Sequence, residues 1–539
     1  MSQILEPVGV LETAQNLISN GLASSAELLL NSFLSLSPSK THNDEGHLVQ
    51  AQASVLLADS LVEGGEYPRA LKLYETGYRA LCNSRNFSDA HRQFVYGVKE
   101  KQAYCHARTG QLLDAIDEME KVPVAYLTVK ACKTLASWYE ETLRFDQARQ
   151  TYLNLLRKEP LALEAMMGAL RHGHMLEDLA QCLPPSPCGD WLNRYMLCYV
   201  AIRSHQYEEA LLELGRLQNE APMNVDVMLA MADCLFKSGE TMKAHYQYKQ
   251  IMKRDHDVVK QMDRYALILK QRGDREQLKK HARTMSRKNP TRPESWLAMA
   301  CCSEMQGDMD TALSFVDRAL ECNRTYAEAW LMKASLLTAA GKFDEALPAY
   351  KRAQAYDETI TSFEGQVECH LQQASPIEAH LAARDAAVRM PRHPKARILV
   401  GGVLKAKGDP ESKKRAKKMF EEAYRLNPLC TEAVLALVTT LEEEENWERA
   451  IEMLKEHSGH IQMATLHHRL AEIYVTRKNF DEAMDQYNIA LRIDPQFEPA
   501  LRGNKRLHRI LASGGHTDLG ATDEEDIDEQ VDELSNGDD

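Results

Sequence analysis

The chain has 539 residues, 44% of them hydrophobic and 27% charged, which is typical of a folded protein rather than a disordered one. This length would provide three or four ordinary domains unless one repeated architecture extends through the chain. No stretch approaches 18 apolar residues without a charge, so we expect no transmembrane helix. The N-terminus has no basic segment ahead of a long apolar run, so we expect no signal peptide and a location in the nucleus and cytoplasm.

The net charge of −14 is unevenly distributed, because residues 518–539 contain eleven Asp or Glu and no Lys or Arg. Residues 1–517 therefore carry a net charge of only −3. A nearly neutral body argues against nucleic-acid binding, which requires a basic face. None of the twelve cysteines has C-x-x-C spacing, so the sequence predicts no zinc knuckle and no thioredoxin-like motif.

The chain begins with residues 1–10, which we expect to be flexible, and continues into a strongly apolar helical unit. In that unit Leu28, Leu29 and Leu30 are consecutive, and one helix face cannot bury all three. They could pack against the second unit and the intervening loop, or they could form a contact between two copies of the chain. The second alternative makes them candidate dimer contacts, because a terminal repeat without a polar outer face needs another cover.

The loop after this unit contains Ser37-Pro38-Ser39-Lys40, the S-P-x-K pattern preferred by cyclin-dependent kinases. A predicted loop is accessible to a kinase, so Ser37 is a candidate phosphosite. A phosphate there would add about −1.5 to −2 units of charge. Ser-Pro pairs are also common in unmodified loops, and the sequence leaves both interpretations open.

A repeat then dominates the chain. Segments such as residues 65–81, 341–357 and 478–495 place an aromatic residue, an alanine and a tyrosine at spacings of three and four, which puts all three on one helix face. Eight of the twelve gaps between successive central residues are 33 or 34 residues long. These central residues, the repeat anchors, are Ala26, Ala70, Ala115, Ala148, Ala210, Ala244, Leu278, Ala312, Ala346, Ala379, Ala416, Ala450 and Ala483.

Two further positions recur with the anchors. A glycine often stands five residues before the anchor, as Gly65 and Gly341 do, where a tight turn needs a positive φ. A small residue often stands twelve before it, which lets two antiparallel helices approach closely. The longest gap, 62 residues, has room for one degenerate unit at 161–183.

This pattern is that of the 34-residue tetratricopeptide repeat, a helix, a turn and a second helix. The sequence therefore predicts an all-α fold, an α-solenoid or superhelix of about 13–14 such repeats over residues 11–495. Such an array leaves no room for a catalytic domain, and no phosphate-binding, metalloprotease or hydrolase motif occurs. We therefore expect a scaffold or adaptor, not an enzyme, with no cofactor, metal or small-molecule substrate.

Two charged runs have a competing functional interpretation. KKRAKK at 413–418 resembles a nuclear import signal, and 442–445 is a run of four glutamates. Because Ala416 is a repeat anchor, the lysines around it should lie on a helix and face solvent. Solvated helix faces are the favoured interpretation of both runs.

The array ends in an amphipathic segment, residues 496–512, that predicts a helix capping the last repeat. Its basic outer face would shield the end of the stack. We expect the remaining residues, 513–539, to be a disordered acidic tail.

Several stretches also match a known family at positions that the repeat leaves free. They are ADSLVEGGEYPRALKLY at 58–74, DWLNRYMLCYVAI at 190–202, NVDVMLAMADCLFKSGE at 224–240, MDRYALILKQRGDREQL at 262–278, FEGQVECHL at 363–371 and FDEAMDQYNIALRIDP at 480–495. Through them the chain resembles the subunit 7 family of the anaphase-promoting complex, or cyclosome. An acidic tail after the array is a further point of similarity.

The resemblance implies a non-catalytic scaffold subunit of a cullin–RING type ubiquitin ligase that controls mitosis through degradation of cell-cycle regulators. It implies a homodimer formed by the repeats of residues 11–200, and contacts of the later array, residues 201–495, with other tetratricopeptide subunits. From the hydropathy and the nearly neutral body, we expect no membrane and no nucleic acid among the partners. The alternative is a generic peptide-binding adaptor, a co-chaperone or transport factor. The co-chaperone form is disfavoured because the residues expected to clamp a carboxylate are instead Val55 and Asp59, Leu331 and Ser335, and His468 and Glu472.

Overall fold

The computed structural model describes residues 7–36, 44–82, 89–173, 187–428, 430–460, 463–495 and 497–512. Candidate phosphosite Ser37 and the acidic tail, residues 513–539, lie outside these ranges, as do most of residues 1–10. Within the described residues all regular secondary structure is helical. None of these helices is both long enough and apolar enough to span a bilayer.

The chain divides into two compact units, Met1–Leu336 with Arg352–Glu358, and Leu337–Lys351 with Thr359–Asp539. The predicted division at residue 200 falls inside the first unit. Helices of the first unit are α1 (Pro7–Ser19), α2 (Ala23–Leu36), α3 (Asp44–Glu63), α4 (Tyr67–Cys82), α5 (Asp89–Arg108), α6 (Leu112–Glu120), α7 (Val129–Glu141), α8 (Phe145–Lys158), α9 (Leu163–Arg171), α11 (Pro187–Arg203), α12 (Tyr207–Glu220), α13 (Val225–Lys237), α14 (Thr241–Arg254), α15 (Met262–Gln271), α16 (Arg275–Lys288), α17 (Pro293–Met305) and α18 (Met309–Cys322).

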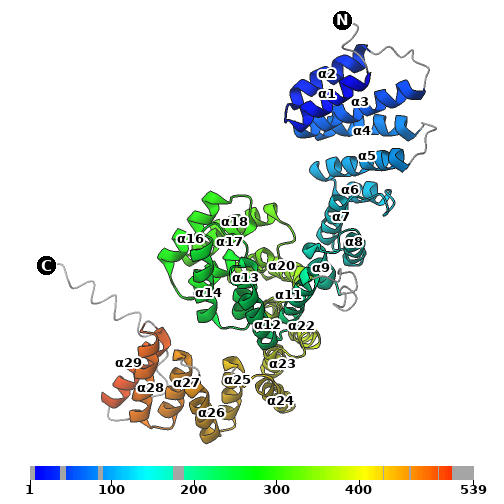
Figure 1. Ribbon diagram of the computed structural model, residues 1–539. Coiled ribbons are helices and arrows are strands. Elements are labelled where there is room, and N and C mark those ends of the chain that lie inside the picture. The colour runs from blue at the N-terminus through cyan, green and yellow to red at the C-terminus, as the bar shows by residue number, and fades with distance from the viewer. Residues whose placement is uncertain are drawn as a thin grey trace, which may run out of the picture. The chain divides into compact units, whose positions relative to one another are not determined.

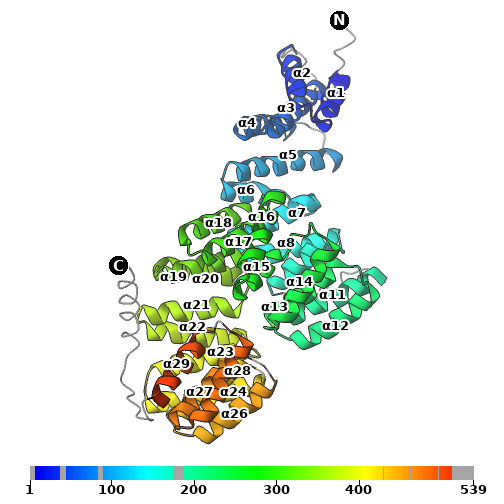
Figure 2. The same ribbon diagram turned by 90° about the vertical axis from the view of Figure 1, so that its left-hand side faces the viewer.

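Two helices contribute residues to both units, and the second unit contains the rest. The shared helices are α19 (Ala327–Ala339) and α20 (Phe343–Tyr356). The second unit continues with α21 (Ile360–Gln372), α22 (Pro376–Arg389), α23 (Pro394–Ala406), α24 (Pro410–Leu426), α25 (Thr431–Glu443), α26 (Trp447–His460), α27 (Ala464–Thr476), α28 (Phe480–Ile493) and α29 (Glu498–Ala512). Consecutive helices form antiparallel pairs in each unit (Figures 1 and 2).

The described helices form thirteen pairs, with α9 and α29 beside them, which confirms the all-α repeat solenoid. In twelve pairs the anchor is the fourth residue of the second helix. Every anchor is at most 1% exposed, including Ala70, Ala148, Ala210, Ala244, Ala312, Ala346, Ala416, Ala450 and Ala483. An alanine fits there because the first helix of the pair crosses close by, where a larger side chain would force the two helices apart.

The exception among the pairs is α24, which begins three residues earlier relative to its anchor, Ala416. This extra turn accounts for the one gap of 37 residues. It also places the KKRAKK segment on a helix, where Lys413 and Lys417 pair with Glu443 and Glu444 at 3.4 and 2.6 Å. Two lysines of the basic run therefore pair with two glutamates of the acidic run across neighbouring repeats.

The turns within the pairs are left-handed throughout, which confirms the role assigned to glycine. Gly65 and Gly341 have φ values of 80° and 74°. The same position takes positive φ where no glycine is present, at Leu143, His205, Ala374, Glu445 and Lys478. The helix-pair geometry therefore imposes a left-handed residue even where the side chain disfavours it.

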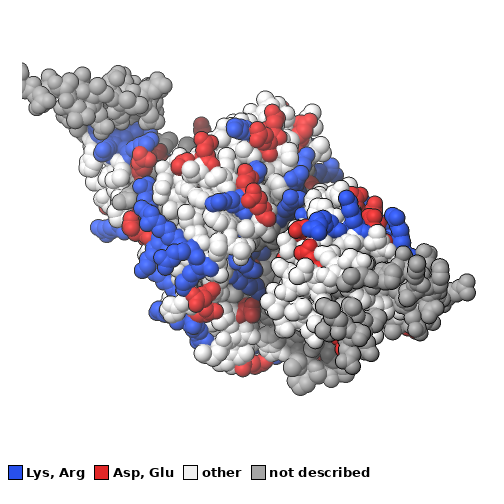
Figure 3. All heavy atoms as spheres, turned by 90° about the horizontal axis from the view of Figure 1, so that it is seen from above, with Lys and Arg blue, Asp and Glu red and all other residues white. Residues whose placement is uncertain are grey.

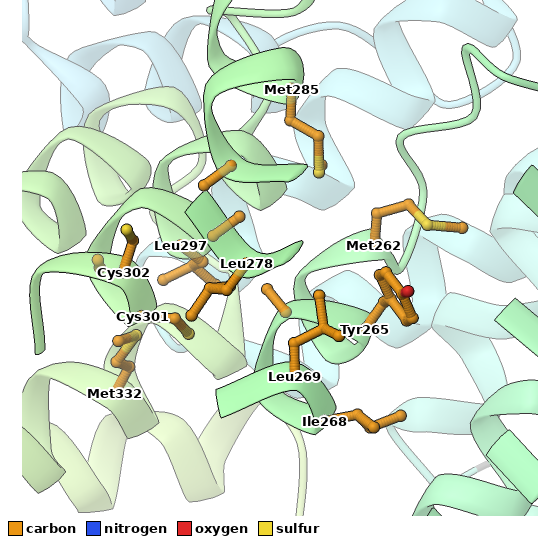
Figure 4. Close-up of a cluster of buried hydrophobic side chains, with 14 of the residues drawn as sticks. Met262, Tyr265, Ile268, Leu269, Leu278, Met285, Leu297, Cys301, Cys302 and Met332 are labelled. Carbon is orange, nitrogen blue, oxygen red and sulfur yellow. The ribbon is translucent and has the colours of Figure 1, made fainter. Parts of the chain in front are cut away.

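Buried apolar side chains form successive clusters along each unit. The largest buried cluster includes Met262, Tyr265, Leu278 and Leu297, contributed by α15, α16 and α17 (Figure 4). Here Leu278 replaces the usual alanine and is fully buried.

Close aromatic contacts to glycine also recur, because a ring four residues after an anchor lies directly over a helical glycine. These pairs are Tyr152 and Gly168, Tyr350 and Gly365, Phe420 and Gly401, and Tyr487 and Gly503. The last of them seats the capping helix α29 on α28.

Candidate protein-interaction surfaces

A buried ion network links the first helices of several repeats in the first unit. The guanidinium of Arg264, on α15, donates to the carboxylates of Asp233, on α13, and Glu328, on α19, the latter at 2.7 Å. Asp233 and Arg264 are only 8% and 9% exposed. A buried guanidinium is tolerated because two carboxylates compensate its charge, and their charges hold the pKa of Arg264 well above its ordinary value despite burial.

The same network is extended by a residue distant in sequence. Asp357, which follows α20, accepts from the Arg203 guanidinium at 2.7 Å and lies 3.8 Å from the Lys237 ammonium. Arg203 and Asp357 are separated by 154 residues. Burial alone would raise the pKa of Asp357, but Lys237 and then Arg203 lower it to about 2.

Asp263 is the most isolated acid in this region. One of its oxygens accepts from the Tyr326 hydroxyl at 2.9 Å, and the other finds no hydrogen-bond partner among the described residues. Burial first, and then the nearby charge of Glu328, raises the pKa of Asp263 to about 7. Its position illustrates how strongly the interior of this unit excludes water.

These charges satisfy one another and so do not present a free basic clamp. The positions compared with a co-chaperone clamp are likewise occupied: Asp59 accepts from the Tyr74 hydroxyl at 2.5 Å, and Glu472 accepts from Tyr487 at 2.5 Å. Each tyrosine lies four residues after an anchor, so these contacts are part of the repeat itself. Within the described residues, no three His, Cys, Asp or Glu side chains are arranged to hold a metal ion.

The N-terminal repeat places the three consecutive leucines in different environments. Leu30 is fully buried, Leu29 is half-buried and Leu28 is 72% exposed. Val8 and Leu22, elsewhere in the same helix pair, are 62% and 51% exposed. Of the three leucines, only Leu28 is fully available for a contact surface, and Leu30 belongs to the core.

The sequence analysis did not identify the ion network. In the sequence, the network is indicated by a charged residue beside the recurrent small residue on the first helix of a repeat, as Asp233 stands beside Ala232. Which charges meet depends on how the repeats are stacked, and a periodic pattern does not contain that information.

Comparison with known proteins agrees with the repeat assignment. Tetratricopeptide repeat family models match residues 306–359 and 464–497. The chain therefore contains tetratricopeptide repeats. The crystal structure titled "APC/C hetero-tetramer Cut9-Hcn1" contains a chain with the same fold, with a TM-score of 0.57 at 17% identity, covering 94% of this chain and 97% of that one.

Among curated tetratricopeptide-repeat proteins, the chain resembles anaphase-promoting complex subunit 7 along nearly its whole length. It is 26% identical to the Dictyostelium discoideum protein over 90% of this chain and 88% of that one. Identity to the Arabidopsis thaliana protein is 27%, over 95% and 96% of the two chains. Identity to the Homo sapiens protein is 25%, over 98% and 96%.

Proposed function

We propose that the chain is a non-catalytic scaffold subunit of the anaphase-promoting complex, acting in ubiquitin-dependent degradation of cell-cycle regulators. The observation that carries this proposal is the end-to-end similarity to subunit 7 proteins of three distant organisms. Similarity confined to the repeat consensus would not extend through the spacing and the atypical units of the whole array. In this proposal, ubiquitin transfer belongs to the cullin and RING subunits, and this chain binds other tetratricopeptide subunits.

The structure supports a scaffold in physical terms. Helix pairs form nearly all of the described chain, and the buried guanidinium of Arg264 in the first unit is paired with the carboxylates of Asp233 and Glu328. Such an array offers large outer surfaces, and repeat solenoids use surfaces of this kind to hold other proteins.

The experiment is native affinity purification of the tagged full chain from dividing cells, followed by mass spectrometry and sizing. We expect recovery of the cullin, the RING protein and the other repeat subunits in one large assembly. Recovery of chaperones or transport factors alone would contradict the proposal and support the generic adaptor. The repeat fold would survive that result.

We further propose that two copies associate through the N-terminal repeats, within residues 11–200. Val8, Leu22 and Leu28 are each exposed, on α1, on the turn after it and on α2. Light scattering of the purified chain across a concentration series should give twice the monomer mass. Leu28→Asp should halve that mass, and Leu381→Asp, at another exposed leucine (58%), should not. A monomer at all concentrations would contradict the homodimer.

A nuclear and cytoplasmic location and phosphorylation of Ser37 accompany this proposal. Imaging of the tagged chain in interphase and mitosis tests the first. Phosphopeptide mapping of mitotic and interphase cells tests the second, and only unmodified Ser37 peptide in mitosis would contradict it.

A further inference from the structure

One short region of the chain is basic, although the chain as a whole is acidic. Residues 241–290 contain fourteen Lys or Arg against five Asp or Glu, in a chain whose net charge is −14. The side chains lie largely on α14 and α16, the second helices of two consecutive repeats. Figure 3 shows Lys and Arg gathered in a continuous band on one face of the molecule.

Helical spacing arranges these charges in two matched rows. On α14, Lys249 and Lys253 are exposed, and one repeat later Arg283 and Arg287 are exposed at the equivalent positions of α16. Lys280, one turn before Arg283, lengthens the second row. We call these five residues the basic ridge. A shallow open hollow of about 320 Å³ lies along α16 and is lined by Glu276, Lys279, Lys280, Arg283 and Thr284.

Although Glu276 lines the same hollow, the members of the basic ridge form no ion pairs with acids among the described residues. Nearby basic residues pair with carboxylates, as Lys243 does with Glu240 and Lys288 does with Asp257 at the edges of the same helices. Within the described residues, no acidic side chain forms an ion pair with any member of the ridge. Five unpaired cations on a small surface repel one another, so an anionic occupant would relieve that repulsion.

The surroundings of the ridge limit the size of that occupant. The next second helix, α18, carries the exposed acids Asp317 and Glu321 at the positions equivalent to Arg283 and Arg287. An extended polyanion such as a nucleic-acid backbone would meet this acidic row. A short acidic segment would not.

Exposed apolar side chains lie beside the part of the ridge that α14 contributes. We call them the apolar corner. Met242 and Tyr246 precede Lys249 on α14 and are 66% and 63% exposed. Leu212 of α12, at the position equivalent to Tyr246 one repeat earlier, is 61% exposed. Three large exposed apolar side chains next to unpaired cations fit an acidic segment that has an apolar residue at one end.

We propose that the basic ridge and its apolar corner form a docking site for a short acidic peptide segment of a partner protein, with an apolar residue at one end of the acidic run. This inference does not depend on which assembly the chain joins. It assigns a ligand class to the second helices of two repeats, whereas the Arg264 network lies on first helices.

The test uses a fluorescein-labelled peptide of two leucines followed by six glutamates, and fluorescence anisotropy with the full chain. Arg283→Glu with Arg287→Glu should raise the Kd at least tenfold. Lys414→Glu with Lys418→Glu is the matched control, because it reverses two exposed unpaired cations at the same i, i+4 spacing on α24. That control should change the Kd less than twofold. Equal losses in the two double variants would overturn the proposal.

Further binding measurements distinguish between the possible occupants of the site. Tyr246→Ala, and a peptide with glycines in place of the leucines, should each weaken binding about threefold, and no change in either would overturn the apolar part of the site. A labelled 20-nucleotide single strand that binds the ridge more tightly than the peptide would overturn the peptide class. Deletion of residues 518–539 should leave the Kd unchanged. A tenfold tighter Kd after that deletion would identify the chain's own tail as the occupant instead.

A folding control accompanies the variants. Arg283→Glu with Arg287→Glu should melt within a few degrees of the wild type. If it does not, Lys249→Ala with Lys253→Ala tests the other row by the same measurement, and an unchanged Kd there would overturn the proposal.

Discussion

The two units of the chain use charge differently, although they are built from the same helix pair. In the first unit, Arg264 joins Asp233 to Glu328, and Asp357 reaches Arg203 across 154 residues. In the second unit, the described ion pairs between helices join close repeats, such as Lys405 with Glu443 at 2.8 Å, and both of these side chains are partly exposed.

The difference separates the contacts that every repeat requires from those that vary between repeats. Anchors, turns and aromatic contacts are the same in both units, because each helix pair needs them. Contacts between distant repeats are not required by the helix pair itself. They fix how the repeats that they join are arranged relative to one another. The following variants test that division, beginning with the one that should have the largest effect.

Replacement of the central cation should destabilise the first unit most. Arg264→Met removes the described ion-pair partner of Glu328 and leaves Asp233 with only the Lys237 ammonium, 3.7 Å away, which should cost about 3–5 kcal/mol of unfolding free energy. Urea denaturation combined with hydrogen exchange in α13 to α19 measures it.

The matched variant in the second unit is Lys395→Met. Its partner Glu432 lies 2.8 Å away, and the two side chains are 35% and 52% exposed. Its removal should cost less than about 1 kcal/mol because water screens the pair. Similar losses in both variants would contradict the comparison.

Two adjacent glycines in α23 offer a paired test of the aromatic contacts in the second unit. A Cβ on Gly401 would lie within 3.0 Å of the Phe420 ring, while a Cβ on Gly402 would meet nothing within 4 Å. Gly401→Ala should therefore destabilise by about 1–3 kcal/mol. Gly402→Ala should stabilise by about 0.5–1 kcal/mol, because alanine is the better helix former. Thermal unfolding of both variants gives the sign directly, and a shared sign would refute the packing argument.

How far the sequence could predict this molecule follows from the same division. Anchor spacing predicted the helix pairs, their number and their left-handed glycine turns, because these are set within one repeat. The spacing placed Leu143 and Lys478 at turn positions, but their residue types gave no sign of a positive φ, since the preference of each residue opposes it. Of the three leucines considered for a dimer contact, only the structure separates buried Leu30 from exposed Leu28.

The candidate surfaces were harder to predict from the sequence, for a related reason. A network such as Arg203 with Asp357 depends on how several repeats curve, a property that accumulates from small rotations between neighbours. The basic ridge is not apparent from the net charge, because the body of the chain as a whole is nearly neutral.

Acid pH should affect the first unit through Asp357. Its pKa is lowered from 3.8 to about 2 in the folded state, so the carboxylate contributes stability above pH 4 and loses it as the pH falls toward 2. The shift corresponds to about 2 kcal/mol. Asp357→Asn should therefore be less stable than the wild type by that amount at pH 6, and the difference should vanish near pH 2. A difference that stays constant with pH would mean that the ionised form is not what matters.

The smallest expected effect concerns the turns, which both units share. Leu143 in the first unit and Lys478 in the second have φ values of 60° and 61°, in the region where a Cβ is strained. Replacement of either by glycine should raise the unfolding free energy by about 0.5–1 kcal/mol, the relief of strain less the added entropy of the unfolded chain. Leu143 is 47% exposed, so little apolar burial is lost.

Gly65→Ala is the reverse control for these turns, because it adds a Cβ at a φ of 80° and should destabilise by a similar amount. Calorimetric scans of Leu143→Gly and Lys478→Gly should show equal gains, since each turn serves only its own helix pair. A gain confined to one unit would mean that the turns, too, respond to contacts between distant repeats, and the division drawn between local and long-range contacts would then fail.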